Sequence, residues 1–338
     1  GVSRERPGPE LGLFALFVRR SKIITDLPRP SQSDEWGRAL SREHLDTVLV
    51  AHAKNAGAVI YQPWRALSVL EDGDQYRCRA QCQETNQEKE LTAQVIIAAS
   101  GSWESSSLPG QARFPSRARS ALLGFKAHFQ GGTLESDLMP LLAFPGGYGG
   151  MVECDDNRVS LSCCIRRDLL KEIQSREQGL AGELVLKHIR RHCLGVEETL
   201  SQAQTLGEWL AIGPIRPGIR LPGQGGIFLV GNAAGEAHPV IAEGISMAMQ
   251  SAWLLTSNLL AWNRQSRESL EEVQQSYARQ WRRAFAPRLR TSRLVAQWAM
   301  RPWLVSLSLP LIRWFPSILN WGARLSGKAR TVTTATQS

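Results

Sequence analysis

The stretch GGIFLVGNAAGEAHPVIAEGISMAM, Gly225 to Met249, decides the fold. Its apolar run, Ile227 to Val230, predicts a buried strand that ends at Gly231 and Asn232. A loop of small residues with one proline follows, and a helix is predicted to begin at Gly244. Small residues let a ligand approach the backbone, and a helix N-terminus offers unpaired N–H groups and a positive dipole end. The stretch is therefore a candidate site for an anion or a polarised cofactor ring, although many glycine-rich turns are only turns.

The composition is that of a folded globular protein whose positive charge is confined to one end. The 338 residues are 43% hydrophobic and 21% charged, enough for one large or two interlocked domains. Residues 261–338 carry 13 Lys/Arg and three Asp/Glu, so 27 Lys/Arg and 28 Asp/Glu remain for the rest. The net charge of +9 therefore belongs to the C-terminal region. Its arginines are interleaved with apolar helix residues and form no recognition motif, so we expect no nucleic-acid partner.

The cysteines predict small core residues in a reducing compartment. The six cysteines form no CxxC pair and show no metal-ligand spacing, so we expect no metal site. No secretory signal is visible, which favours a cytoplasmic protein. The first residue is Gly and not Met, which indicates that the native N-terminus is missing.

Three segments outside the opening stretch predict further elements. Residues 41–57, SREHLDTVLVAHAKNAG, have a serine N-cap, an apolar face and a glycine stop, which predict a helix. We expect the apolar face to be packed, with His52 on it packed and not catalytic. Arg42 opens this helix, where a cation gains nothing from the dipole, so we expect it to serve a ligand. Leu11 to Val18 predicts a buried strand, and Val95 to Ala99 predicts a second one.

From Phe114 to about Leu206 the pattern changes to that of an antiparallel sheet. Apolar and polar residues alternate over 123–129, residues 138–144 form an apolar run, and residues 148–165 read as a hairpin. A helix is predicted at 180–193. This segment sits between two groups of buried strands, as an inserted second domain would.

Residues 263–338 predict a basic, helical C-terminal region. Its last apolar segment, 303–321, is interrupted by two prolines and Arg313, so we expect no membrane span. Two alternatives stay open: helices that only cover the domain, or an interfacial anchor in peripheral contact with a membrane. The anchor would place three tryptophans at headgroup depth, namely Trp303, Trp314 and Trp321.

Three separated motifs together resemble one family. ALSREHLDTVLVAHAKNAGA at 39–58, VIIAASGSW at 95–103 and GGIFLVGNAAGEAHPVIAEGISMAMQSAWLL at 225–255 match it in order and spacing. They resemble the flavin-dependent aromatic hydroxylase and geranylgeranyl reductase superfamily, whose fold is typified by p-hydroxybenzoate hydroxylase. The resemblance covers most of residues 36–262.

The resemblance implies an α/β (α+β) fold, in which a Rossmann-like FAD-binding domain is interrupted by a β-sheet substrate domain. The FAD-binding domain would take residues 1–113 and 207–262, the substrate domain 114–206, and the helical tail 263–338. The family begins with a strand, a GxGxxG turn and a helix that hold the FAD pyrophosphate. This sequence lacks that element, so we expect the first βαβ unit to be missing and FAD binding to be weakened.

The resemblance also assigns cofactor contacts residue by residue. Arg42 matches the helix arginine that approaches FAD, and Ala66 falls where the backbone contacts the adenine side. Gly231 and Asn232 occupy the family's Gly-Asp pair, whose carboxylate accepts from the ribityl hydroxyls. The asparagine keeps an acceptor oxygen but removes a negative charge beside the flavin. Pro239 matches the proline along the isoalloxazine ring.

The remaining site predictions concern the reactive ring and the substrate. Gly244 and Ile245 would supply N–H groups to the pyrimidine edge, where the helix dipole stabilises an anionic reduced flavin. Tyr148 and Glu243 would line the substrate pocket. His238 is the candidate acid or base, with a hydrogen-bonded structural histidine as the alternative.

The implied activity is an NADH- or NADPH-dependent monooxygenase that uses FAD to hydroxylate an apolar or aromatic small molecule. Phe144–Glu153 has Gly150 where geranylgeranyl reductases carry a motif tryptophan, and the tryptophan-rich halogenase signature is not found. Both departures favour a hydroxylase. The alternatives are reduction of an isoprenoid double bond by reduced FAD, and a non-catalytic or truncated flavoprotein remnant.

Overall fold

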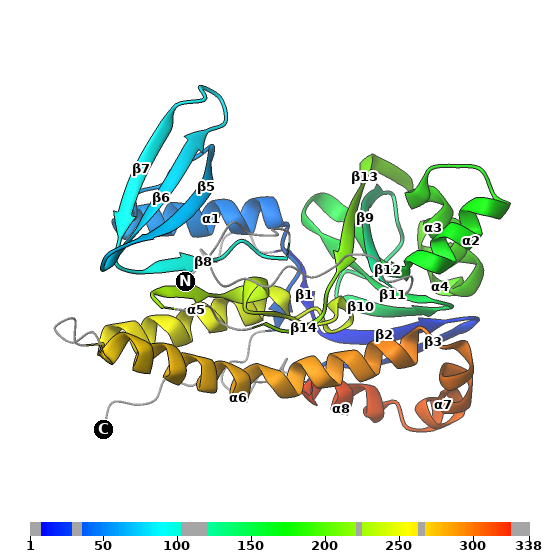
Figure 1. The fold of residues 1–338 in the computed structure, drawn as a ribbon. Coiled ribbons are helices and arrows are strands. Elements are labelled where there is room, and N and C mark those ends of the chain that lie inside the picture. The colour runs from blue at the N-terminus through cyan, green and yellow to red at the C-terminus, as the bar shows by residue number, and fades with distance from the viewer. Residues whose placement is uncertain (1–7, 29–35, 103–120, 221–224, 263–267, 326–338) are drawn as a thin grey trace.

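The computed structural model describes residues 8–28, 36–102, 121–220, 225–262 and 268–325. A large sheet with three helices forms one half, and smaller sheets with two helices form the other (Figure 1). A long C-terminal helix runs along both halves (Figure 1). The predicted α/β fold with C-terminal helices is confirmed.

The large sheet has seven strands in the order β13-β9-β12-β11-β10-β2-β3. Only the β10–β2 pair is parallel; every other neighbouring pair is antiparallel. In that order the strands are Gln204–Ile215, Leu122–Gln130, Arg158–Arg166, Gly147–Cys154, Leu138–Phe144, Leu13–Val18 and Ser21–Asp26. The strand, hairpin and sheet patterns predicted between residues 123 and 165 therefore form as expected.

The sheet extends beyond the predicted insertion at both ends. β2 and β3 belong to it, although residues 1–113 were assigned to the FAD-binding domain, and β13 continues past residue 206 to Ile215. β2 joins the sheet because it is apolar on both faces: Leu16 and Phe17 point to opposite sides and are 0% and 3% exposed. The predicted boundary at 113/114 lies outside the described residues.

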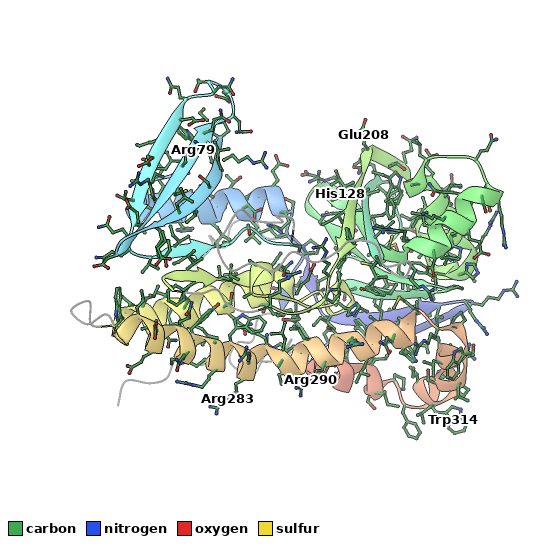
Figure 2. The ribbon with its side chains drawn as sticks, viewed as in Figure 1. Arg79, His128, Glu208, Arg283, Arg290 and Trp314 are labelled. Carbon is green, nitrogen blue, oxygen red and sulfur yellow. The ribbon has the colours of Figure 1, made fainter. Side chains whose placement is uncertain are left out.

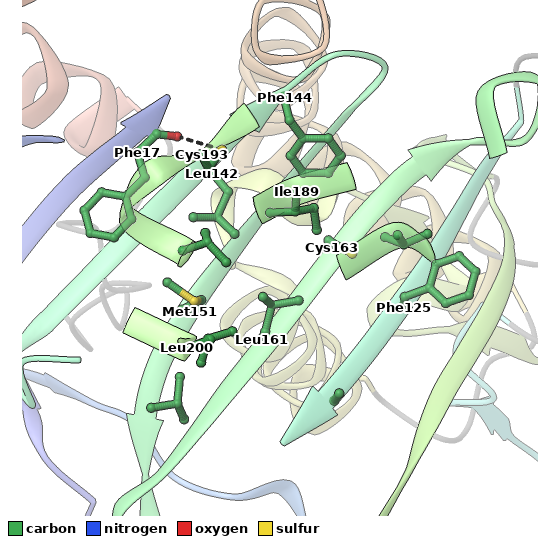
Figure 3. Packing of buried hydrophobic residues seen from close by; sticks show 14 of the residues in the cluster. Phe17, Phe125, Leu142, Phe144, Met151, Leu161, Cys163, Ile189, Cys193 and Leu200 are labelled. Atoms are coloured by element: carbon green, nitrogen blue, oxygen red, sulfur yellow. Dashed lines mark hydrogen bonds between the residues drawn. The ribbon is translucent and has the colours of Figure 1, made fainter. Parts of the chain in front are cut away.

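Each face of this sheet is covered by helices. One face packs against α2 (Arg167–Arg176), α3 (Ala181–His192) and α4 (Leu194–Leu200), and α3 confirms the predicted helix at 180–193. Figure 3 shows the resulting core, which includes Phe17, Leu142, Met151, Leu161 and Ile189. The opposite face packs against the C-terminal helices, through residues that include Leu16, Ala143, Ala296, Val305 and Ile312.

The other half is built around two parallel strands, β8 (Ile96–Ala98) and β15 (Ile227–Leu229). Both were predicted as buried strands. The burial is confirmed for β15, where Phe228 is 0% exposed, but only in part for β8, where Ala98 is 8% and Ile97 51% exposed, because no described element covers Ile97 on its side. The predicted helix after the loop is α5 (Gly244–Ala261). Strand, loop and helix N-terminus therefore follow one another as the opening stretch indicates.

The helix α1 (Arg42–Asn55) begins as predicted, with the hydroxyl of Ser41 accepting from the His44 N–H at 3.3 Å. The expected burial of its apolar face is wrong, since none of its residues is buried and it makes only sparse contact with the other described elements. A three-stranded antiparallel sheet follows it. Its strands are β5 (Trp64–Asp72), β6 (Gln75–Cys82) and β7 (Glu88–Ala93).

The C-terminal region forms α6 (Glu268–Ala299), α7 (Pro302–Trp314) and α8 (Ser317–Leu325). The first half of α6 packs Tyr277 and Phe285 against α5 and β15, and its last turns pack against the seven-stranded sheet. Within the described residues, no helix has the length and apolarity needed to cross a membrane. Two short strand pairs complete the fold: β1 (Glu10–Leu11) with β4 (Gly37–Arg38), and β14 (Gly218–Ile219) with β16 (Gly235–Glu236).

Candidate active site

A cavity of about 1090 Å³ lies between the seven-stranded sheet and the loops that follow β8 and β15. The sheet contributes mainly apolar groups, among them Phe14, Phe125, Met139, Leu141 and Met151. The loops contribute Ser100, Gly101, Asn232, Pro239 and Ala242, and the C-terminal helices contribute Val295, Trp298, Ile312 and Leu319. The cavity is therefore bounded by all three regions of the chain.

The loop between β16 and α5 is held in place by α6. The backbone N–H of His238 donates to Oγ of Ser292 at 3.1 Å, and Ser292 is fully buried. Arg288 lies 3.9 Å from the carboxylate of Glu243, and both side chains are nearly inaccessible to water. A buried charge pair is costly unless both partners stay in place, so this contact fixes the loop against the helix.

Tyr148 and His238 join the sheet to this loop. The phenol oxygen of Tyr148 lies 3.1 Å from Nδ1 of His238. Burial raises the pKa of Tyr148 far above its usual value, so the phenol keeps its proton. Burial, followed by repulsion from Arg293, lowers the pKa of His238 to about 4, so the imidazole is neutral at pH 7. A protonated phenol and a neutral imidazole therefore share this hydrogen bond, and the imidazole tautomer sets which of the two donates.

A buried polar network supports Asn232. Glu236 is 6% exposed and lies 3.0 Å from Arg220, and it also accepts from the Ser102 hydroxyl at 2.9 Å. The side-chain NH₂ of Asn232 donates to Oγ of Ser102 at 3.1 Å, and Arg220 donates to the Asn232 carbonyl. No described residue donates to Oδ1 of Asn232. That oxygen can therefore accept from a ligand in the cavity, as the predicted ribityl contact requires.

The glycines of the opening stretch differ in what surrounds them. Gly231 is buried with φ +58°, and a Cβ there would lie 3.1 Å from the Ala248 Cβ. Gly244 begins α5, the side chain of the preceding Glu243 makes no capping hydrogen bond to that N-terminus, and a Cβ at Gly244 would meet nothing within 4 Å. Ile245 is 42% exposed. Gly231 is thus required by its left-handed backbone conformation and by the close approach of Ala248, whereas Gly244 has room for a side chain.

The structure brings some predicted site residues together and leaves others apart. Arg42, Tyr148, Asn232 and Pro239 line the cavity. The other predicted site residues are not among those that line it: Gly231, His238, Glu243, Gly244 and Ile245 lie in the loops and helix end behind or beside it, and Ala66 is on an exposed part of β5. The predicted Ala66 contact with the adenine side stays a prediction.

Sequence reasoning missed several lining residues. Lys126 on β9 stands opposite Ser162 on β12, and both face the cavity together with Ser160. Among the described residues Lys126 has no carboxylate partner. The alternation around Lys126 marks its side of the strand as polar, but only the pairing of β9 with β12 shows that this side faces a cavity. No group of three or more His, Cys, Asp or Glu that could hold a metal occurs in the described part of the chain.

Solved structures with this fold include FAD-dependent enzymes. A myxobacterial chondrochloren halogenase, an FAD-dependent enzyme, has a TM-score of 0.68 at 20% identity over 83% of this chain and 66% of its own. A geranylgeranyl bacteriochlorophyll reductase-like protein from Thermoplasma acidophilum has a TM-score of 0.64 at 17% identity over 100% and 79%. A probable FAD-dependent monooxygenase from Pseudomonas aeruginosa has a TM-score of 0.63 at 15% identity over 90% and 83%.

These likenesses show the fold, and the chain spans less than two thirds of the halogenase's length. No curated protein sequence matches the chain significantly. The family model described as FAD binding domain matches residues 12–289, which is most of the chain and includes every predicted site residue. The chain therefore belongs to the FAD binding domain family.

Proposed function

We propose that the protein is an NADH- or NADPH-dependent flavin monooxygenase that hydroxylates an apolar, aromatic small molecule. The observation that carries the proposal is the cavity of about 1090 Å³, which is lined mainly by apolar side chains on the sheet and, on the opposite wall, by three of the predicted flavin residues, Arg42, Asn232 and Pro239. Ligand cavities of this size and polarity hold drug-sized molecules. Its volume leaves room for a substrate beside a flavin ring.

The described residues fit FAD on this wall. Oδ1 of Asn232, to which no described residue donates, suits a ribityl hydroxyl, and Pro239 presents a flat apolar surface to the ring. At the N-terminus of α5 the Glu243 side chain makes no capping hydrogen bond, and nothing lies within 4 Å of a Cβ at Gly244. The first N–H groups of a helix have no intrahelical acceptor and favour negative charge. Bound FAD would supply the redox chemistry and oxygen activation, and the protein would supply position and electrostatics.

His238 acts in this proposal as a positioning residue. It does not line the cavity, it is neutral at pH 7, and it shares a hydrogen bond with Tyr148. An imidazole with a pKa of about 4 is a poor proton donor at pH 7, where little of it is protonated. Tyr148, which does line the cavity, is thereby held with its ring against the substrate space.

Lys126 narrows the class of substrate. Arg42 is paired with Asp46 at 2.8 Å and Glu236 with Arg220 at 3.0 Å, so Lys126 is the cavity-lining charge that no described carboxylate offsets. Ser160 and Ser162 add hydroxyl groups beside it. We therefore infer an apolar substrate that carries one carboxylate or phenolate oxygen, which Lys126 and the serines would bind.

The test uses the full gene product that contains this chain. FAD binding is measured by flavin absorbance after gel filtration, and oxygen uptake is then followed with NADH or NADPH and a panel of aromatic carboxylates and phenols. We expect substrate-dependent oxygen uptake and a tenfold or larger rise in KM for Lys126→Met with the charged substrates. If the purified protein binds no FAD, the proposal is refuted.

Reduction of an isoprenoid double bond is the second candidate. The largely apolar cavity and the likeness to a geranylgeranyl reductase-like fold favour it. A reductase would consume NADH or NADPH anaerobically in the presence of a prenyl substrate, whereas a monooxygenase requires oxygen. Substrate turnover without oxygen would therefore replace the first proposal with this one.

A further inference from the structure

The helix α7 carries apolar side chains on two opposite faces. Its inner face packs on the seven-stranded sheet through Val305, Leu309 and Ile312, which are 1%, 8% and 5% exposed. Its outer face carries four large side chains, Trp303, Leu307, Leu311 and Trp314, which are 64%, 75%, 56% and 82% exposed. At 3.6 residues per turn, these four positions fall on one side of the helix.

The apolar surface continues into the start of α8. Phe315 and Ile318 are 56% and 37% exposed. We call these two residues and the four on α7 the outer apolar face. An exposed group of two tryptophans, a phenylalanine and three aliphatic residues is unusual on a monomeric soluble protein and marks an interaction surface. The side chain of Trp321, the third predicted anchor, lies outside the described residues.

The segment of sequence that carries the outer apolar face is strongly basic. Residues 273–338 contain 11 Lys/Arg and no Asp/Glu. Arg283 and Arg290 on α6 are exposed, and they project toward the same edge of the molecule as Trp314 (Figure 2). The guanidinium of Arg313 donates to Oγ of Ser21 at 2.7 Å, next to the exposed Arg20 at the β2–β3 turn.

We propose that the outer apolar face docks on the surface of an anionic lipid bilayer. Tryptophans favour the headgroup region, leucines enter the acyl boundary, and surrounding arginines are attracted to anionic lipids. A second copy of the chain would suit this face poorly, because a symmetric dimer through it would bring two sets of arginines together.

The outer apolar face also adjoins the cavity, because the two share lining residues. Leu311 and Ile318 line the cavity and are exposed on the outer apolar face, and Ile312 and Leu319 line the cavity beside them. An apolar substrate dissolved in the bilayer could therefore reach the cavity between α7 and α8 without crossing water. This part rests on the proposed function, whereas the docking itself does not.

The test measures sedimentation of the protein with vesicles of phosphatidylcholine alone or with 30% phosphatidylglycerol, without added flavin or substrate. We expect binding to the anionic vesicles that falls with added salt. Leu307→Glu and Trp314→Glu should each weaken it roughly tenfold or more, because the apolar contact is lost and a like charge is added. The control Leu180→Glu changes a leucine that is 71% exposed at the start of α3 and should bind like the wild type.

A second measurement guards against variants that fold poorly. Vesicles with brominated acyl chains should quench the tryptophan fluorescence of the wild type, and Trp303→Phe with Trp314→Phe should remove most of that quenching while sedimentation persists. Equal binding by the Leu307→Glu and Leu180→Glu variants would overturn the proposal. So would a wild-type dimer that Leu307→Glu converts to a monomer and that does not bind vesicles. If the wild-type protein binds anionic vesicles but shows no oxygen uptake with any substrate, the proposed function is contradicted and the docking proposal still stands.

Discussion

The phenol oxygen of Tyr148 and Nδ1 of His238, 90 residues apart in the chain, lie 3.1 Å from each other. Tyr148 comes from β11 in the centre of the seven-stranded sheet, and His238 from the loop that follows β16. Their rings meet edge to face with centroids 6.2 Å apart. This contact links the wall proposed for the substrate to the wall proposed for the flavin.

Tyr148→Phe should destabilise the fold without changing its shape. The ring stays, but Nδ1 of His238 loses its hydrogen-bond partner in a largely buried position, which costs about 1–2 kcal/mol of unfolding free energy. Urea unfolding monitored by circular dichroism measures this. Tyr61→Phe is the matched control, because Tyr61 is 37% exposed and its hydroxyl contacts only the exposed Lys89 among the described residues. Equal losses of unfolding free energy in Tyr148→Phe and Tyr61→Phe would contradict the hydrogen bond between Tyr148 and His238.

His238 should make the protein less stable in acid. Its pKa is about 4 in the folded protein because of burial and of Arg293, against about 6.5 in the unfolded chain. The unfolded chain thus binds more protons between these values, so stability falls as the pH drops from about 6.5 to 4, by up to about 3 kcal/mol. The loss is complete below pH 4.

His238→Asn keeps an acceptor for Tyr148 and removes the titration. The decrease in unfolding free energy between pH 7 and pH 4.5 should therefore be smaller in the variant. His128 and His188, whose pKa values are also lowered mainly by burial, retain part of the decrease. His52→Asn, at an exposed position on α1, should reproduce the wild-type curve. A His238→Asn curve parallel to the wild type would show that the histidine is not buried in solution.

Gly231 and Gly244 should respond to substitution in opposite ways. Gly231→Ala places a Cβ at φ +58° and 3.1 Å from the Ala248 Cβ, so we expect a loss of about 1–2 kcal/mol. Gly244→Leu should change stability by no more than about 0.5 kcal/mol, because nothing lies within 4 Å of a Cβ there. It should nevertheless lower FAD affinity at least tenfold, measured by flavin fluorescence titration. Unchanged affinity would remove the α5 N-terminus from the FAD site.

The Arg288–Glu243 pair should contribute strongly to the placement of the loop before α5. Arg288→Met leaves a carboxylate that is 5% exposed without its cation, which costs about 3 kcal/mol. Arg283→Met, on the exposed side of the same helix, should cost less than about 0.5 kcal/mol. Thermal unfolding compares the two variants. If the two variants have the same melting temperature, the Arg288–Glu243 pair does not hold the loop against α6.

Local sequence patterns were sufficient for the elements of the opening stretch. The run at Ile227–Val230 is apolar on both sides, so it could be stable only as a buried strand. The small residues after it and the apolar segment from Gly244 allowed only a tight loop and a helix. The same reasoning placed the strands of the seven-stranded sheet, because period-two alternation is a local property.

The assignment of strands to sheets could not be predicted in the same way. Leu13–Val18 was correctly expected to be a buried strand. Its apolar sequence does not determine which sheet it joins, because many other strands could pair with it equally well. It pairs with β10, more than 100 residues away, which places it in the seven-stranded sheet. The exposed face of α1 was misjudged for a related reason: an apolar stripe shows what a helix could bury, and not whether a partner covers it.

The sequence by itself therefore determined the strand, loop and helix of Gly225–Met249 and, through the motifs spaced around it, the family. Backbone preferences and hydrophobic periodicity act over a few residues, so a single sequence carries them. Only the tertiary structure decided that Lys126 faces the cavity, that Tyr148 reaches His238, and that α7 turns a second apolar face outward. Those relationships depend on which surfaces meet across long separations in the chain, and pairing between distant segments leaves no local pattern.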